Sequence, residues 1–158
     1  MSRLDSFLRR LLAQRDGIDW AAAAVASVAG DALDIGLGYG RTYDHLRARL
    51  PGRRVWVIER VVDCHPDCRP PEADLLLGEA GPMLARMAAM GVRLALAHYD
   101  LGFGDKARDV AEAAALAPRV VPLMAPGGIV VSAQPLPGLA AVPGPASVPP
   151  ERYLFYRA

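Results

Sequence analysis

The stretch that most constrains the fold of this chain is ALDIGLGYGRTYDHLRARL, residues 32–50. An apolar run interrupted only by Asp34 is followed by three glycines at alternate positions, Gly36, Gly38 and Gly40. Glycine adopts positive φ at little cost and places no Cβ in the way of a ligand. The first N–H groups of the helix that follows point back toward the same turn. A strand, turn and helix of this kind predict a binding crevice at the carboxyl end of a sheet.

The spacing of the glycines separates two classes of ligand. The dinucleotide fingerprint is G-x-G-x-x-G, whereas this chain has G-x-G-x-G with Arg41 at the position of the third glycine. A carboxylate at Asp34 is awkward beside a pyrophosphate but well suited to a cationic amine. The D-I-G-L-G-Y-G run resembles motif I of the class I S-adenosylmethionine-dependent methyltransferases. That resemblance implies that Asp34 contacts the methionyl amino group. It further implies a cofactor-binding backbone formed by Gly36, Leu37, Gly38 and Gly40.

Two further acids fit this resemblance. The β-branched run 54–59 is typical of a buried parallel strand and ends in Glu59, next to Arg60. An acid at this distance from the glycine turn binds ribose hydroxyls, because one carboxylate accepts hydrogen bonds from both. A third strand over 73–77 is followed by Gly78, Glu79 and Ala80. The resemblance implies that Glu79 accepts a hydrogen bond from the adenine amino group and that Ala80 offers a backbone N–H. Glu79 could equally stabilise the helix dipole.

The end of the fourth strand, expected over 92–97, carries the candidates for catalysis: His98, Tyr99 and Asp100. In the family that this chain resembles, this strand end lies beside the transferable methyl group. Histidine could act as a general base, and His98 could instead be a polar neighbour of the cofactor. Because positioning of the reactants can suffice, no base is obligatory. At the start of the glycine-turn helix, Arg41 and Thr42 either contact the cofactor or substrate, or are solvated.

No metal site is expected. Cys64, His65 and Cys68 lie in an irregular, proline-rich segment over 61–72, but C-x3-C with one histidine is a poor zinc spacing. Asp100 could begin a magnesium site like that of catechol-type O-methyltransferases. The fifth strand, however, is followed by residues 133–135, which include no acid, so the oxygen ligands are incomplete. The [DN]-P-P-[FYW] signature is absent after the fourth strand, which argues mildly against methylation of DNA bases or amides.

Leu4, Phe7, Leu8, Leu11 and Leu12 recur at helical spacing. We expect this helix to end at Asp16-Gly17 and a second helix, capped by Asp19, to run from Trp20 to about Ala29. Such a lead-in could cover the cofactor or substrate mouth, or pack against the sheet or a partner subunit.

Composition excludes several function classes. The chain has 158 residues and a formal net charge of +1, which argues against a nucleic-acid partner. No apolar run reaches the roughly 20 residues of a membrane span, and the opening segment lacks the features of a signal peptide. We expect a cytoplasmic protein with no membrane partner. The bias toward alanine, leucine and arginine suggests a GC-rich genome, which we expect to be bacterial.

Together these features predict an α/β protein with a three-layer αβα, Rossmann-like methyltransferase fold. The sheet order is expected to be 3-2-1-4-5, with a Pro-Gly-Gly turn before strand five and one antiparallel C-terminal edge strand. We expect a single domain over 1–158, with a helical lead-in (1–30), a cofactor-binding core (31–134), a Pro/Gly-rich loop (135–150) and the terminal strand (151–158). The predicted function is transfer of a methyl group from S-adenosyl-L-methionine to a small-molecule acceptor. The chain could also form a homo-oligomer in which a second subunit completes the site. A non-catalytic adenosyl-binding protein and an NAD(P)-binding oxidoreductase remain the alternatives.

Overall fold

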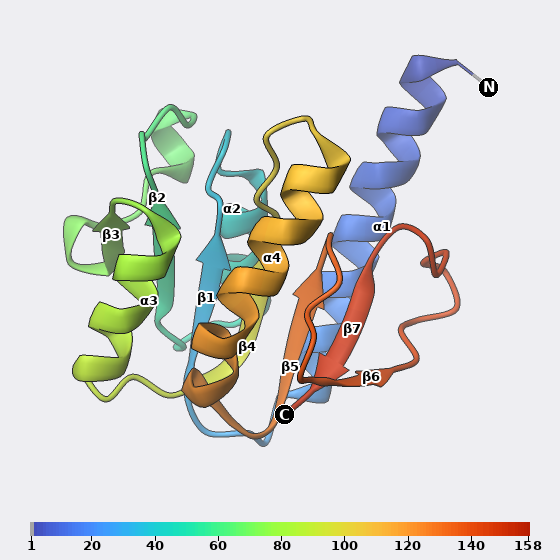
Figure 1. The fold of residues 1–158 in the computed structure, drawn as a ribbon. Coiled ribbons are helices and arrows are strands. Elements are labelled where there is room, and N and C mark those ends of the chain that lie inside the picture. The colour runs from blue at the N-terminus through green and yellow to red at the C-terminus, as the bar shows by residue number, and fades with distance from the viewer. Residues whose placement is uncertain (1) are drawn as a thin grey trace.

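The computed structural model describes residues 2–158 and contains a seven-stranded sheet in the order β3-β2-β1-β4-β5-β7-β6 (Figure 1). Five strands are parallel, and β7 and β6 are antiparallel. In chain order the strands are β1 Asp31–Ile35, β2 Val55–Glu59, β3 Leu75–Leu77, β4 Leu94–Tyr99, β5 Met124–Ser132, β6 Ala140–Val142 and β7 Leu154–Arg157. The predicted order of the first five strands is confirmed.

Helices cover both faces of this sheet and make three layers. The helices are α1 Arg3–Ala24, α2 Arg41–Arg49, α3 Ala80–Ala89 and α4 Lys106–Val120, with 3-10 turns at Pro66–Cys68, Glu72–Asp74 and Val121–Leu123. One buried cluster packs α3 and α4 on one face, and a second packs α1 and α2 on the other. Because both faces are covered, the central strands are buried along almost their whole length.

The helical lead-in differs from the prediction, since α1 is one continuous helix through Gly17. Gly17 is needed for packing, because a Cβ there would lie only 3.1 Å from the ring of Phe155. Asp19 does not cap a second helix. Its Oδ1 accepts hydrogen bonds from Arg49 and lies 2.7 Å from Nε2 of His45, which ties α1 to α2.

The carboxyl-terminal part of the sheet also differs from the prediction. A second antiparallel strand, β6, lies within the expected Pro/Gly-rich loop and pairs with β7. Its three residues lie in a region rich in proline and glycine, so no strand pattern marks it.

The Pro-Gly-Gly segment lies within β5 and not before it. Pairing with β4 shifts register across this segment, between Leu94 and Leu96. The expected turn is therefore an irregularity inside a paired strand.

Between β2 and β3 the chain forms two 3-10 turns and no α-helix, as the proline-rich segment predicted. No helix among residues 2–158 is long and apolar enough to span a membrane. The parallel strands all end at the same edge of the sheet, which is the upper edge in Figure 1. The glycine turn and the loops after β2 and β4 meet there.

Candidate functional site

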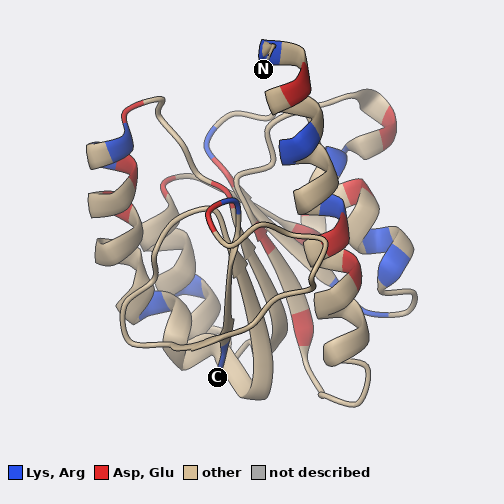
Figure 2. Ribbon diagram, turned by 90° about the vertical axis from the view of Figure 1, so that its right-hand side faces the viewer, with Lys and Arg blue, Asp and Glu red and all other residues tan. Residues whose placement is uncertain are grey.

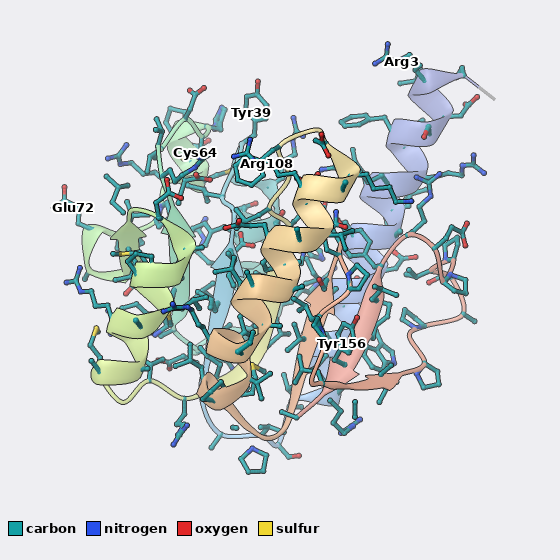
Figure 3. All side chains as sticks on the ribbon, viewed as in Figure 1. Arg3, Tyr39, Cys64, Glu72, Arg108 and Tyr156 are labelled. Atoms are coloured by element: carbon teal, nitrogen blue, oxygen red, sulfur yellow. The ribbon has the colours of Figure 1, made fainter. Side chains whose placement is uncertain are left out.

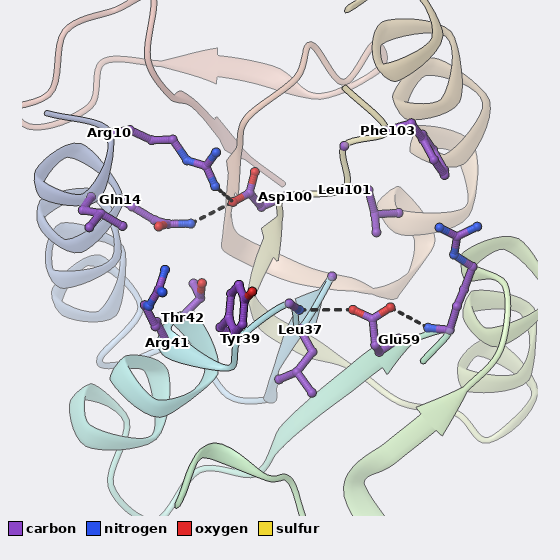
Figure 4. A pocket seen from close by; sticks show the side chains of 15 residues that line it. Arg10, Gln14, Leu37, Tyr39, Arg41, Thr42, Glu59, Asp100, Leu101 and Phe103 are labelled. Carbon is purple, nitrogen blue, oxygen red and sulfur yellow. Dashed lines mark hydrogen bonds and ion pairs between the residues drawn. The ribbon is translucent and has the colours of Figure 1, made fainter. Parts of the chain in front are cut away.

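A cavity of about 260 Å³ opens at the carboxyl edge of the parallel strands (Figure 4). It runs from the glycine turn after β1 to the ends of β2 and β4, and the first half of α1 forms its remaining wall. The residues that line it are Arg10, Leu11, Gln14, Gly36, Leu37, Gly38, Tyr39, Arg41, Thr42, Glu59, Arg60, Asp100, Leu101, Gly102 and Phe103. The structure therefore brings the glycine turn and Glu59 together around one space, as the sequence predicted.

The three glycines of the turn have different surroundings. A Cβ on Gly36 would lie 2.9 Å from the carbonyl oxygen of Asp100, so this glycine lets the ends of β1 and β4 approach closely. Gly38 has φ of 50° and nothing within 4 Å of a Cβ position, which leaves its backbone open to a ligand. Gly40 caps α2 and lies against the loop of Cys64 and Cys68 instead of lining the cavity.

Glu59 is held in place by backbone donors. Its Oε2 accepts a hydrogen bond from the N–H of Gly38 at 3.2 Å, and its Oε1 accepts one from the N–H of Arg60 at 2.7 Å. A carboxylate has about four acceptor sites, so both oxygens retain a lone pair for a ligand. This arrangement fits a vicinal diol.

A small cleft beside Glu59 contains the residues predicted to bind adenine. Gly78, Glu79 and Ala80 line it together with Arg60, Phe103 and the unpredicted Glu112. The guanidinium of Arg60 lies 5.0 Å from the centroid of the Phe103 ring and 3.8 Å from Oε1 of Glu79. The cleft measures only about 20 Å³ and the Arg60 guanidinium lies near the ring of Phe103, so a planar heterocycle would enter only if the Arg60 side chain moved aside.

Asp100 lies at the wall of the cavity, and donors from both ends of the chain converge on one of its oxygens. Its Oδ2 accepts hydrogen bonds from Nε2 of Gln14 at 2.8 Å and from the hydroxyl of Tyr153 at 3.3 Å. The guanidinium of Arg10 lies 3.5 Å from the same oxygen. Among residues 2–158 no hydrogen bond is made to Oδ1, which leaves that oxygen available to a ligand.

Asp34 does not line this cavity. It is fully buried and its Oδ1 is hydrogen-bonded to Nδ1 of His98 at 2.8 Å. His98 is equally buried, and its ring stacks on Tyr153 with centroids 6.1 Å apart. Asp34 Oδ2 and His98 Nε2 have no partner among the described residues. The structure thus brings Asp34 and His98 together but keeps both side chains away from the cavity wall.

Burial affects the protonation of this pair. Loss of water around the carboxyl raises the pKa of Asp34, and the hydrogen bond from His98 opposes that rise only in part. Burial alone would lower the pKa of His98, but the hydrogen bond and the charge of Asp34 outweigh it and raise this pKa above 6.5.

Tyr99 points to the opposite face of the sheet, among the residues under α3 and α4. Its hydroxyl is buried and has no hydrogen-bond partner within residues 2–158. Burial raises its pKa, with a further rise from the charges of Glu112 and Asp109. Of the three catalytic candidates, Asp100 lines this cavity and a second one that adjoins it, whereas His98 and Tyr99 are buried within residues 2–158 and line neither of them. The predicted direct contact of His98 and Tyr99 with an acceptor has no support in this geometry.

A second cavity of about 410 Å³ adjoins the first across Asp100. Both cavities share Arg10, Asp100, Leu101 and Gly102 as wall. The remaining wall comes from the loop after β4, the first turn of α4, the residues after β5 and the segment before β7: Gly104, Asp109, Ala133, Gln134, Glu151, Arg152 and Tyr153. Asp100 therefore stands between two adjoining spaces, the second of which has a polar lining.

The other predicted residues fall into two groups. Arg41 and Thr42 line the first cavity, and the Arg41 guanidinium lies 5.1 Å from the ring centroid of the exposed Tyr39. Cys64, His65 and Cys68 lie behind Gly40, and residues 2–158 contain no group of three or more ligands placed to hold a metal ion.

The sequence left open whether the helical lead-in covers the mouth of the site, and it did not single out the residues of α1 that do so, Arg10, Leu11 and Gln14. It gave no sign of Tyr153, from the segment before β7. Arg10 and Gln14 are one helical turn apart, so they share a face, but nothing in the sequence states which part of the sheet that face meets.

Comparisons with known proteins agree with this geometry. A family model described as S-adenosyl-L-methionine methyltransferase matches residues 1–158. A crystal structure of an S-adenosyl-L-methionine methyltransferase from Silicibacter pomeroyi DSS-3 is 38% identical, with a TM-score of 0.93 over 99% of this chain and 98% of that chain. No curated protein matches this sequence.

More distant structures share the fold alone. Human methyltransferase-like protein 13 in complex with SAH is 11% identical, with a TM-score of 0.55 over 94% of this chain and 81% of that chain. The plantazolicin methyltransferase BpumL in complex with SAH is 12% identical, with a TM-score of 0.51 over 79% and 46%. Because the family model matches this chain over residues 1–158, this chain belongs to the S-adenosyl-L-methionine methyltransferase family.

Proposed function

We propose that this protein transfers a methyl group from S-adenosyl-L-methionine, the cofactor of its family, to a small polar acceptor. The observation that carries this proposal is the pair of adjoining cavities that meet at Asp100. The first is bounded by the glycine turn and Glu59, and the second has room for another molecule. The cofactor supplies an activated sulfonium methyl group. The chain's task is then to orient the two molecules and exclude water.

The first cavity fits the nucleoside end of the cofactor. Glu59 would accept hydrogen bonds from the two ribose hydroxyls, because both of its oxygens retain lone pairs beyond their backbone donors. The adenine would lie at the small cleft of Phe103 and Glu79, with the Arg60 side chain displaced to make room for it. Gly38 would lie against the methionine and ribose, since its backbone faces open space.

Asp100 is the residue that we assign to the methionyl ammonium group. It and Glu59 are the acids in the wall of the first cavity. Asp34, which the family resemblance implied for this role, is buried against His98. Asp34 would act indirectly, because its hydrogen bond to His98 holds the ends of β1 and β4 together beneath the glycine turn. Direct contact between Asp34 and the cofactor stays a prediction.

The acceptor would occupy the second cavity. Its charged and polar wall, with Gln134, Glu151 and Arg152, suits a polar molecule better than an apolar one. A nucleophile placed beside Asp100 would lie next to the methionine end of the first cavity. Since Oδ2 already accepts hydrogen bonds from Gln14 and Tyr153 and lies 3.5 Å from the Arg10 guanidinium, Asp100 is held in place and would orient the bound groups.

Titration calorimetry followed by a methyl-transfer screen tests this function. We expect S-adenosylmethionine and S-adenosylhomocysteine to bind, NADH not to bind, and radiolabelled methyl groups to reach a small polar acceptor. Binding of both adenosyl compounds without transfer to any acceptor would favour a non-catalytic binding protein. Binding of NADH alone would point to an oxidoreductase, and absence of adenosyl binding would refute the proposal.

A further inference from the structure

Tyr153 connects the wall of the second cavity to Asp100. It lies directly before β7 and lines the second cavity together with Glu151 and Arg152. Its hydroxyl donates a hydrogen bond to Oδ2 of Asp100 at 3.3 Å. The preceding segment, 135–150, contains no charged residue and is tan in Figure 2. The carboxyl-terminal part of the chain thus reaches Asp100 through a neutral hydroxyl group.

The ring of Tyr153 is fixed by its surroundings. Tyr153 is 3% exposed and belongs to the buried cluster that packs α1 and α2 on the sheet. Its ring stacks on the ring of His98, with an angle of 29° between the two planes. His98 is itself hydrogen-bonded to Asp34. Because packing on both the ring and its neighbour restricts this side chain, its hydroxyl is well suited to hold another group in place.

The hydroxyl of Tyr153 can act only as a steady donor toward Asp100. Burial raises the pKa of Tyr153, and the charge of Asp100 raises it further, so the phenol keeps its proton. Gln14 donates to the same carboxylate oxygen from α1 at 2.8 Å. The third neighbour, Arg10, has a side chain that is 54% exposed, and an ion pair as exposed as this contributes little. Tyr153 and Gln14 therefore fix Oδ2 and leave Oδ1 to a ligand.

We propose that Tyr153 is a positioning residue for methyl transfer, which turns Oδ1 of Asp100 toward the methionyl ammonium group of the cofactor. This inference rests on the proposed function, in which Asp100 binds that group. Tyr153 acts through Asp100, and it does so from the wall against which the acceptor would bind. The acceptor side of the site thereby contributes to the affinity for the cofactor.

Tyr153→Phe tests this role, because it removes the hydroxyl and keeps the ring that stacks on His98. Calorimetry compares two ligands: S-adenosylhomocysteine, and 5′-methylthioadenosine, which keeps the adenosine but has no amino or carboxyl group. We expect the variant to bind S-adenosylhomocysteine about threefold to tenfold more weakly, the effect of one hydrogen bond. It should bind methylthioadenosine as the parent does. A loss of overall structure would weaken both ligands alike.

Tyr156→Phe is the matched control. Tyr156 is a buried tyrosine of β7 whose hydroxyl accepts a hydrogen bond from the N–H of Leu136 at 3.0 Å. It lines neither the first nor the second cavity. Figure 3 shows it well below Tyr39 and Arg108, which lie near the upper edge of the molecule. This variant should bind both ligands as the parent does.

A second comparison makes the same change in a chain that already lacks the carboxylate. Added to Asp100→Asn, Tyr153→Phe should change the affinity for S-adenosylhomocysteine by less than about twofold, because the charge that it positions is gone. The inference is overturned if Tyr153→Phe binds S-adenosylhomocysteine as the parent does, if it weakens both ligands alike, if Tyr156→Phe has the same effect, or if its effect is undiminished beside Asp100→Asn. Failure of the parent to bind S-adenosylhomocysteine would instead refute the proposed function, and this inference with it.

Discussion

Oδ1 of Asp34 lies 2.8 Å from Nδ1 of His98, and neither side chain has accessible surface. The two residues lie side by side in the parallel register of β1 and β4. This contact turns the acid of the glycine-turn motif away from the cofactor cavity. It also places a titratable pair in the core.

The first prediction concerns pH. Because the pKa values of both Asp34 and His98 are raised in the folded protein, the folded state binds more protons than the unfolded chain above the ordinary values of 3.8 and 6.5. The free energy of unfolding should therefore fall as pH rises through this range. Urea unfolding from about pH 6 to about pH 9 measures the slope. His98→Gln should flatten the slope, and an unchanged slope in that variant would contradict the assignment.

The second prediction separates the two acids as cofactor ligands. Asp100→Asn should weaken binding of S-adenosylhomocysteine about tenfold to a hundredfold, the equivalent of a charged hydrogen bond of about 1.5–3 kcal/mol. Asp34→Asn keeps the shape of the buried pair and should change affinity by less than about threefold. Calorimetry at a pH where both variants are folded gives the two values. A larger loss from the Asp34 variant would return the direct role to Asp34.

The third prediction concerns Glu59. Glu59→Gln should weaken binding about tenfold, because an amide has one acceptor oxygen in place of two and carries no charge. The exposed Glu72, outside both cavities, provides the control Glu72→Gln, which should bind as the parent does. If 2′-deoxyadenosyl and adenosyl ligands lose affinity equally in the Glu59 variant, this residue does not contact the ribose.

The fourth prediction concerns the glycine turn. Gly40 and Gly52 have similar φ values of 82° and 78°, but a Cβ on Gly40 would lie 2.5 Å from Cβ of Cys68, whereas one on Gly52 would meet nothing within 4 Å. Gly52→Ala should cost about 1 kcal/mol of unfolding free energy from backbone strain alone. Gly40→Ala should cost at least about 1 kcal/mol more. Urea denaturation of both variants measures the difference, and equal losses would show that the loop yields to the added methyl group.

Local patterns predicted most of the fold. Apolar runs alternating with helices predicted a parallel sheet, and the order of its strands was what the resemblance to the methyltransferase family implied. The proline-rich segment between β2 and β3 was expected to replace or shorten a crossover helix, and two 3-10 turns stand there. The break predicted in α1 was wrong because Gly17 serves a close contact with Phe155 from the far end of the chain. The three residues of β6 are a strand because β7 pairs with them, and the local sequence holds no sign of it.

The site was predictable only in part, for a related reason. Glu59 and the glycine turn belong to motifs whose spacing is local, and they meet as predicted. The position of Asp34 depends on which residue of β4 lies beside it, and that residue is His98. The wall formed by Gln14 and Tyr153 depends on how distant elements pack against Asp100. A single sequence does not show which residues from distant elements come into contact.

The convergence of Gln14 and Tyr153 on one oxygen of Asp100 has a consequence for biosynthesis. A nascent polypeptide that has emerged from the ribosome as far as β5 already has the glycine turn and Glu59. It lacks Tyr153, which donates to Asp100 from the other side, because Tyr153 directly precedes β7, the strand to which both β5 and β6 pair. Assembly of a competent methionine pocket therefore waits until translation has passed Tyr153, and partly synthesised chains should not capture the cofactor.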